Sequence, residues 1–365
     1  MKVKFLDLAI KDDYLKKKYL SSINNIFNYG KIIDGKKLNE FQKKMSKISG
    51  RKYCIGLSSG TDALFLALKA LNLKKNDEII TTPLSWISPA NAILISGAKP
   101  VFADIDEDLN ISPQSISSLI NKKTKAILCV NFTGTVCQMD KILKICKKNK
   151  LFLIEDASQS FGATYKNKMS GSFGTISAIS HNPMKVLSAY GEAGSILTNN
   201  KKIYETIKIL KYSGMINKKY CKIPSLNSKM DEIQSAILVE NLKKFKEIIK
   251  IRNKNARFYN KHLGHIVSCP KMSNSENINI FYAYTIKANE RNKLRNFLSK
   301  NKIETNIQHP ILICDQKPFQ KFKKRVTNAK KIVKKILSLP ISEKLKINQQ
   351  RFVIKKIKDF YKNEI

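Results

Sequence analysis

A lysine in an unusual setting is the first candidate for chemistry. Lys185 is the only lysine between Ser170 and Asn200, in a chain with 61 lysines. A desolvated amine attacks carbonyl carbons and forms an imine, which is the chemistry of nucleophilic lysines. Lys185 also falls between a short β-rich run and a turn that contains glycine. The setting, rather than the residue type, therefore predicts a nucleophilic lysine here.

Two acidic residues, Glu155 and Asp156, end the apolar run LFLIED and are followed by small residues. Ligands of open parallel sheets bind beyond the carboxyl ends of the strands, which is where such acids lie. A carboxylate that faces a pyridine nitrogen keeps that nitrogen protonated and makes the ring an electron sink. The alternative interpretation is that the acids are ordinary turn or cap residues.

A small polar loop leads into an apolar helix near the start of the chain. The segment from Cys54 to Asp62 reads CIGLSSGTD and runs directly into ALFLALKAL. The first N–H groups of a helix have no intrahelical partners, so they favour an anion such as phosphate. The alternative is that Ser59, Thr61 or Asp62 only caps the helix.

The elements that must position these residues follow an α/β rhythm. Short β-rich runs alternate with helical patterns between about residues 52 and 199, which predicts a mainly parallel sheet sandwiched by helices. The predicted strands are EIITT, PVFADI, AILCVNF, LFLIED, AIS and SILT. From about Asp231 apolar residues recur every three to four positions, which predicts a long amphipathic helix.

Further elements follow this helix and predict a second domain. They are a strand at FYAYTIKA, two lysine-rich helices at 291–302 and 328–337, and the segment LSLPIS. We therefore expect an N-terminal segment and large domain over residues 1–245, and a small C-terminal α+β domain over residues 246–365.

The charge of the chain is unusual. Its 365 residues include 68 Lys and Arg against 28 Asp and Glu, a net charge of +40, and only seven of the basic residues are Arg. Proteins that bind phosphates or base edges favour the planar fork of Arg. Lysine spread through the whole chain instead indicates compositional drift, so specific nucleic-acid binding is the minority interpretation. The charge should still attract polyanions weakly and in a salt-dependent way.

The seven cysteines are odd in number and contain no Cys-x-x-Cys pair. This pattern argues against a zinc site and a disulfide framework, so we expect no metal and a reducing compartment. The start, MKVKFLDLAIKDD, meets an acid too early for a signal peptide. The uncharged stretch 79–98 contains two prolines and many polar residues, and it is a poor membrane span. We expect a cytoplasmic protein without membrane insertion.

Six blocks of sequence, in one order, resemble a known family. The chain is similar to the DegT/DnrJ/EryC1/StrS aminotransferases, which use pyridoxal 5'-phosphate (PLP), have the type I fold of PLP-dependent transferases and aminate nucleotide-linked keto-sugars. The resemblance covers nearly the full length and is far more specific than any single block. The blocks are SSGTDALFLALKAL (58–71), PLSWISPANAI (83–93), IEDASQSFGA (154–163), SHNPMKVLSAYGEAG (180–194), LNSKMDEIQSAI (226–237) and LSLPIS (337–342).

The resemblance implies roles for individual residues around PLP. Lys185 would form the imine with the cofactor and later carry the proton between the carbons of the two imines. Asp156 would pair with the pyridinium nitrogen, and Gln159 would contact the ring oxygen. Trp86, the only tryptophan, would stack on the cofactor face, although a lone tryptophan is otherwise usually core packing. The phosphate-holding positions would be Gly60, Thr61 and Ser180.

Three more positions concern a neighbouring subunit or the substrate. Asn227 matches an Asn that reaches the cofactor phosphate of the neighbouring subunit, which implies a homodimer with shared active sites. The family commonly reads Asn-Tyr-Arg-Met there, whereas this chain has Lys229 in place of the Arg and so lacks its planar fork. His309 matches a position near the substrate mouth and is a candidate substrate contact, although a lone histidine is more often structural.

The resemblance implies a two-step transamination. An amino donor, glutamate in the family, would load the cofactor, and a nucleotide-diphosphate keto-sugar would then take the amino group to form an amino sugar for glycan or polysaccharide biosynthesis. One alternative is a sugar dehydratase of the same fold, but that branch carries a His in place of the lysine at 185. The other alternative is a basic protein that binds polyanions or nucleic acid and retains the fold without the chemistry.

Overall fold

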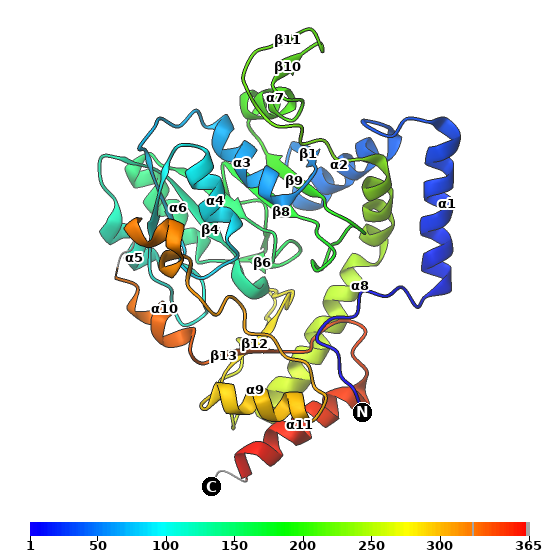
Figure 1. The fold of residues 1–365 in the computed structure, drawn as a ribbon, viewed down its shortest axis with the longest axis vertical. Helices are drawn as coiled ribbons and strands as arrows, with labels where there is room; N and C mark the ends of the chain where they lie inside the picture. The colour runs from blue at the N-terminus through cyan, green and yellow to red at the C-terminus, as the bar shows by residue number, and fades with distance from the viewer. Residues whose placement is uncertain (323–324, 363–365) are drawn as a thin grey trace.

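A computed structural model describes residues 1–322 and 325–362 of the chain. Its centre is a twisted seven-stranded sheet with the order β1-β9-β8-β5-β4-β2-β3 (Figure 1). The strands are β1 (Tyr53–Leu57), β2 (Glu78–Thr81), β3 (Lys99–Phe102), β4 (Thr124–Val130), β5 (Phe152–Asp156), β8 (Ile176–Ser180) and β9 (Gly194–Thr198). Within the described residues β9 runs antiparallel to both of its neighbours, and the other pairings are parallel. The predicted α/β class with a mainly parallel sheet is confirmed.

Helices cover both faces of the sheet because its strands are apolar on both sides. Along β4, for example, Ile127 packs into the core on one face and Leu128 into the core on the other. One core lies under α2 (Lys36–Ser49), α5 (Pro113–Leu119), α6 (Met139–Asn149) and the first part of α8 (Glu232–Leu263). The opposite core lies under α3 (Gly60–Ala70), α4 (Ser88–Ile95) and α7 (Lys201–Leu210).

Strand β1 corrects one expectation. The segment from Cys54 to Leu57 was predicted as the beginning of a polar loop, but it is a buried strand paired with β9, in the register Cys54 to Leu197 and Leu57 to Gly194. Its apolar side chains complete the sheet, and the polar loop is confined to the residues after Leu57. The other predicted strands of the sheet are confirmed.

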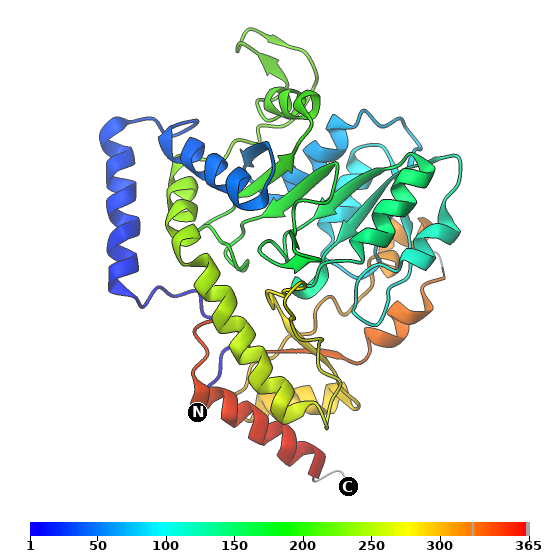
Figure 2. The ribbon, with the colours of Figure 1, turned by 180° about the vertical axis from the view of Figure 1, so that it is seen from behind.

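The long helix predicted from about Asp231 is confirmed as α8, which runs from the sheet to a second group of elements (Figure 2). There β12 (Tyr284–Lys287) pairs antiparallel with β13 (Ile336–Leu339), beside α9 (Arg291–Lys300) and α11 (Ile347–Lys362). A separate core forms between them, and Val3 from the N-terminus is buried in it. Because α8 continues without a break across residues 245 and 246, the division into two domains stays a prediction.

The second lysine-rich helix is shorter than predicted. The pattern at 328–337 predicts a helix, but α10 (Thr327–Ile332) ends early, and Ile336 and Leu337 belong to β13. Pairing with β12 outweighs the local helical pattern, because both residues are fully buried in the sheet that it forms. The segment around α10 packs against the β3 edge of the large sheet through Phe319 and Phe102.

The remaining elements are short or peripheral. Helix α1 stands apart from the sheet and packs along α8, and the β10–β11 hairpin projects beside α7 at the top of the view (Figure 1). No helix among residues 1–322 and 325–362 is both long and apolar enough to cross a membrane. The short or peripheral elements are α1 (Asp13–Tyr29), β6 (Thr164–Tyr165), β7 (Lys168–Met169), β10 (Met215–Ile216), β11 (Tyr220–Cys221), η1 (Phe132–Gly134), η2 (Ile313–Asp315) and η3 (Lys317–Phe322).

Candidate active site

A cavity of about 600 Å³ opens at the carboxyl edge of the sheet. It is formed by the loops that follow β1, β2, β5 and β8, together with residues 306–310 and Tyr282 from the C-terminal part. Parallel strands end at one edge, so loops far apart in sequence meet there. Eight of the ten residues predicted from the sequence line this cavity: Gly60, Thr61, Trp86, Asp156, Gln159, Ser180, Lys185 and His309.

Lys185 lies in the connection between β8 and β9. Its backbone N–H donates to Asn182 O at 2.8 Å, which closes a tight turn just before it. The side chain is half-buried, and its Nζ lies 4.7 Å from the centre of the Tyr282 ring. Lys185 therefore presents its amine to the cavity above an aromatic face, where water is partly excluded.

Asp156 is the last residue of β5 and is buried at the floor of the same cavity. Its Oδ1 accepts a hydrogen bond from Ser158 N at 3.0 Å. Burial raises the pKa of Asp156, while hydrogen bonds from Ser158 and the charge of Lys185 oppose that rise. A cationic ring nitrogen would supply the charge partner that a buried carboxylate needs, so Asp156 fits a protonated pyridine.

The start of α3 forms a tight cradle against the end of β8. A Cβ atom added to Gly60 would lie 2.4 Å from the Cβ of Ser180 and 2.8 Å from its Cα, so only glycine allows this approach. Ser59 accepts from Asp62 N at 3.0 Å and caps the helix, as the alternative interpretation expects. The Thr61 hydroxyl is exposed, 2.8 Å from that of Ser88. The cap leaves the first N–H groups of the helix available to an anion such as a phosphate.

Gln159 is buried beside Asp156, and its amide orientation is set by the protein. Its Oε1 accepts a hydrogen bond from Thr133 N at 2.9 Å. Thr133 adopts a left-handed conformation with φ 57°, which turns this N–H toward the glutamine. Because the oxygen is occupied, the side-chain nitrogen of Gln159 remains as the donor for a ligand oxygen.

Trp86 and His309 lie beside each other in the lining of the cavity. Trp86 is 60% exposed, so it is not a core residue, and its ring lies 5.9 Å from that of His309. His309 also lies 5.7 Å from the ring of Phe132. Burial, and secondarily the charge of Lys185, lower the pKa of His309 to about 4. The imidazole is therefore neutral at physiological pH and adds no second cation beside Lys185.

Asn227 and Lys229 lie away from this cavity. Lys229 donates a hydrogen bond to Asn227 Oδ1, and its Nζ lies 4.6 Å from the ring of Tyr212. Lys229 lines a separate shallow pocket that also includes Ile33 and Lys218. Neither residue lines the Lys185 cavity of its own chain, so a role in catalysis requires them to act on another copy.

Several residues of the cavity were not singled out from the sequence. Ser158 accepts from Ser180 N at 2.9 Å and so joins the β5 and β8 loops. Asn182 donates to Glu192 at 2.5 Å, and this bond links the two ends of the β8–β9 connection that carries Lys185. Ser158, Asn182 and Glu192 lie within the quoted blocks, which was the available signal. Tyr282 and Gln308 come from segments without such a signal, and only the fold brings them to the cavity.

Glu155, beside Asp156, has a structural role. It is fully buried and accepts hydrogen bonds that tie the loop after β7 to the sheet, while Arg51 binds the carbonyls of that loop at Gly171 and Gly174. The donors to Glu155 are Asn131 Nδ2 (2.9 Å), Ser170 Oγ (3.2 Å), Gly171 N (2.7 Å), Phe173 N (3.0 Å), Gly174 N (3.3 Å) and Ser177 Oγ (3.0 Å).

We expect Glu155→Gln to lower the free energy of unfolding by about 1.5–3 kcal/mol, the usual value of a hydrogen bond to a charged group. The new amide turns a donor toward groups that are themselves donors. Urea denaturation of the two proteins measures the difference. The matched control is Glu276→Gln at an exposed carboxylate, which should change stability by less than about 0.5 kcal/mol. Equal midpoints for Glu155→Gln and the wild type would contradict the prediction.

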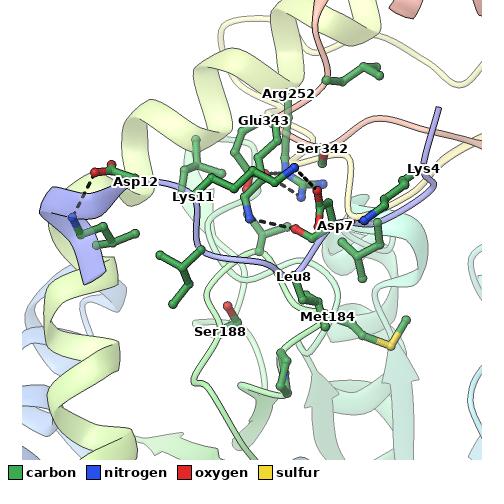
Figure 3. A pocket seen from close by; sticks show the side chains of 18 of the residues that line it. Lys4, Asp7, Leu8, Lys11, Asp12, Met184, Ser188, Arg252, Ser342 and Glu343 are labelled. Carbon is green, nitrogen blue, oxygen red and sulfur yellow. Dashed lines mark hydrogen bonds and ion pairs between the residues drawn. The ribbon is translucent and has the colours of Figure 1, made fainter. Parts of the chain in front are cut away.

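A second cavity, of about 870 Å³, is larger (Figure 3). It lies beneath the N-terminal segment and shares Met184 and Lys185 with the first. Several of its charged groups are paired with one another: Lys4 and Lys11 bind Asp7, and Arg252 binds Glu343 at 2.9 Å. Asp156, Gln159 and Ser180 do not line this larger cavity and all lie in the smaller one.

Comparisons with known proteins agree with this arrangement. The profile of the DegT/DnrJ/EryC1/StrS aminotransferase family matches residues 13–358. A "Pleiotropic regulatory protein" of Geobacillus stearothermophilus is 33% identical over 371 residues, covering 100% of both chains. The UDP-2-acetamido-2-deoxy-3-oxo-D-glucuronate aminotransferase of Pseudomonas aeruginosa is 31% identical over 340 residues, covering 93% of this chain and 95% of the relative.

A solved structure adds the cofactor. NtdA of Bacillus subtilis, described with the bound cofactor PMP, superposes with a TM-score of 0.93 at 28% identity, covering 99% of this chain and 85% of NtdA. The expected fold and the expected cofactor are thereby confirmed. The chain belongs to the DegT/DnrJ/EryC1/StrS aminotransferase family and is an aminotransferase that uses pyridoxal phosphate.

Proposed function

We propose that the Lys185 cavity transfers an amino group from glutamate to the ketone of a nucleotide-diphosphate-linked sugar. The observation that carries the proposal is that one cavity holds a lysine amine, a buried carboxylate and a glycine cradle at a helix start. The Pseudomonas relative is named as an aminotransferase of a UDP-linked 3-oxo sugar, which supports this substrate class. The product would be an amino sugar for glycan or polysaccharide biosynthesis.

The residues of the cavity fit pyridoxal phosphate. Asp156 would bind the ring nitrogen, Gln159 the ring oxygen, and Trp86 would cover one face. The phosphate would be held by Gly60, Thr61 and Ser180, where the helix start offers N–H groups and hydroxyls. When bound, the cofactor supplies an electron sink for the carbon that carries the amino group.

The chain itself supplies the proton transfers. Lys185 would be the nucleophile that holds the cofactor, and in each half-reaction its amine would move a proton between the substrate carbon and the cofactor carbon that exchange the amino group. Tyr282 beneath the amine and the Trp86–His309 wall limit access of water to it. Ser158 and Lys185 help to keep Asp156 ionised against the effect of burial.

The charge of the chain supports an anionic substrate. A net charge of +40 attracts a nucleotide diphosphate over long range and raises its rate of encounter with the cavity. This use of the positive charge requires no specific nucleic acid. The odd number of cysteines without a Cys-x-x-Cys pair supports action in the cytoplasm, where thiols stay reduced.

The active enzyme would be a homodimer with shared sites. Asn227 and Lys229 lie outside the cavity of their own chain, so they would reach the cofactor phosphate or the substrate of the neighbouring copy. Mixing the inactive variants Lys185→Ala and Asn227→Ala should restore activity, because one site of a mixed dimer then has both residues. Failure of refolded mixtures to recover any turnover would contradict shared sites.

A substrate panel tests the reaction. The purified protein with pyridoxal phosphate and glutamate is incubated with UDP-, dTDP- and GDP-linked keto-sugars, and mass spectrometry follows the change of ketone to amine. We expect one nucleotide keto-sugar to be converted with matching formation of 2-oxoglutarate. Loss of a water from the sugar without amination would instead indicate the dehydratase alternative, and bound cofactor without any turnover would contradict the proposal.

A further inference from the structure

The loop that carries Lys185 is built around a buried imidazole. His181 follows β8 directly and is completely inaccessible to solvent. Its N–H donates to Ala193 O at 2.8 Å, and its carbonyl accepts from Ala189 N at 2.7 Å. The backbone of His181 therefore closes the loop on itself, with Lys185 between the closing contacts.

The side chain of His181 makes two further bonds. Nδ1 lies 3.2 Å from Leu187 O, and Nε2 lies 2.9 Å from Ser195 Oγ. A carbonyl oxygen can only accept, so Nδ1 carries the proton and the Ser195 hydroxyl donates to Nε2. Burial lowers the pKa of His181 to about 4, so the ring keeps this single neutral form at physiological pH. The ring also packs edge-on against Phe41, with 5.4 Å between centres.

The same stretch of loop is held from its other side by helix α8. Asn241 donates to Ser188 O at 2.7 Å, and the hydroxyl of Tyr19 donates to Asn241 in turn. Figure 3 shows Ser188 and Met184 on the wall of the larger cavity. The carbonyls of two consecutive residues, Leu187 and Ser188, are thus each bound by a different side chain.

We propose that His181 is a positioning residue for Lys185: its bond from Nδ1 to Leu187 O fixes the turn that holds the lysine amine over Tyr282. The inference rests on the proposed function, in which Lys185 is the catalytic amine. A buried polar ring is unfavourable unless it is hydrogen-bonded, whereas an apolar ring would pack against Phe41 equally well. What the imidazole adds to packing is therefore its two bonds, and one of them holds a carbonyl two residues from Lys185.

Three substitutions separate the two bonds. His181→Asn retains a nitrogen near the position of Nδ1 and can still donate to Leu187 O. His181→Gln retains one near Nε2 and the link to Ser195, and His181→Phe retains only the ring. We expect Asn to keep kcat within about 3-fold of wild type. Gln and Phe should lower kcat about 10- to 100-fold, the range that small misplacements of a reacting group produce, with little change in KM.

A second readout does not depend on turnover. The visible absorbance of the bound cofactor changes with pH as the imine between the cofactor and Lys185 gains or loses a proton. The pH midpoint of this change should shift in the Gln and Phe variants and not in the Asn variant. Thermal melting without cofactor measures the stability of each variant. Ser195→Ala removes only the partner of Nε2 and should leave the midpoint unchanged. The matched control is His265→Phe at an exposed histidine, which should change nothing.

The outcomes are distinct. Rescue by Asn alone supports positioning through Leu187 O. The inference would be overturned if all three variants had the wild-type kcat and the wild-type pH midpoint of the cofactor absorbance. It would also be overturned if all three lost kcat in proportion to their melting temperatures, and His181 would then be a packing residue. Peptide mapping of the wild-type protein after reduction with borohydride shows whether Lys185 carries the cofactor. Absence of the label there overturns the proposed function rather than this inference.

Discussion

Replacement of Lys185 by alanine is expected to lower kcat by about 10²–10⁴-fold or more, because the amine is both the attachment point and the proton carrier. The cavity holds no second lysine among its described lining residues, and the neutral His309 is held between two aromatic rings. Turnover of glutamate with the keto-sugar identified in the panel measures the loss. The visible absorbance of the covalent linkage should vanish in the same variant.

Two controls make this result specific. Lys201→Ala removes an exposed lysine at the start of α7, which does not line the cavity, and should retain full activity. Lys185→Arg keeps the positive charge but not a nucleophilic amine, and it should be as inactive as the alanine variant. If Lys185→Arg retained most of the wild-type turnover, the charge and not the covalent chemistry of Lys185 would be the essential property.

Asp156→Asn should produce opposite changes in activity and in stability. A neutral amide cannot hold a protonated ring nitrogen, so kcat should fall by about 10²–10³-fold, as when one preorganised electrostatic partner is removed. The folded protein without cofactor should nevertheless become more stable at neutral pH. Thermal melting with and without pyridoxal phosphate, beside steady-state kinetics, measures both effects.

The sign of the stability change follows from the pKa. Burial raises the pKa of Asp156, so the folded state binds the proton more tightly than the unfolded state does. The stability that this residue contributes is therefore present at low pH and is lost as the pH rises through its folded-state value. The advantage of Asp156→Asn should shrink on acidification and reverse when cofactor is added.

Two observations would contradict this account of Asp156. One is an apo protein that melts at a lower temperature after Asp156→Asn at neutral pH, which would mean that the carboxylate is satisfied without a cationic partner. The other is unchanged kcat, which would mean that the ring nitrogen has another partner. Asp13→Asn, at an exposed acid on α1, is the matched control and should alter neither quantity.

Local patterns predicted most of the architecture. The apolar runs that end at Asp156 and Ser180 form buried strands, and the periodic pattern from Asp231 forms one long helix. Two elements differed, and each for a tertiary reason. The strand from Tyr53 exists because it pairs with β9, and the helix predicted to reach Leu337 stops where β12 offers a partner.

The sequence by itself determined the family and the main chemical groups, because six blocks in register carry Lys185, Asp156 and the helix start at Gly60. Tertiary structure alone decided that Tyr282 lies under the amine. It also gave His181 its two bonds around the lysine loop. Hydrophobic periodicity is a local property that sets which face of a segment is buried. A cavity instead depends on how distant segments pack, and no local pattern encodes that approach.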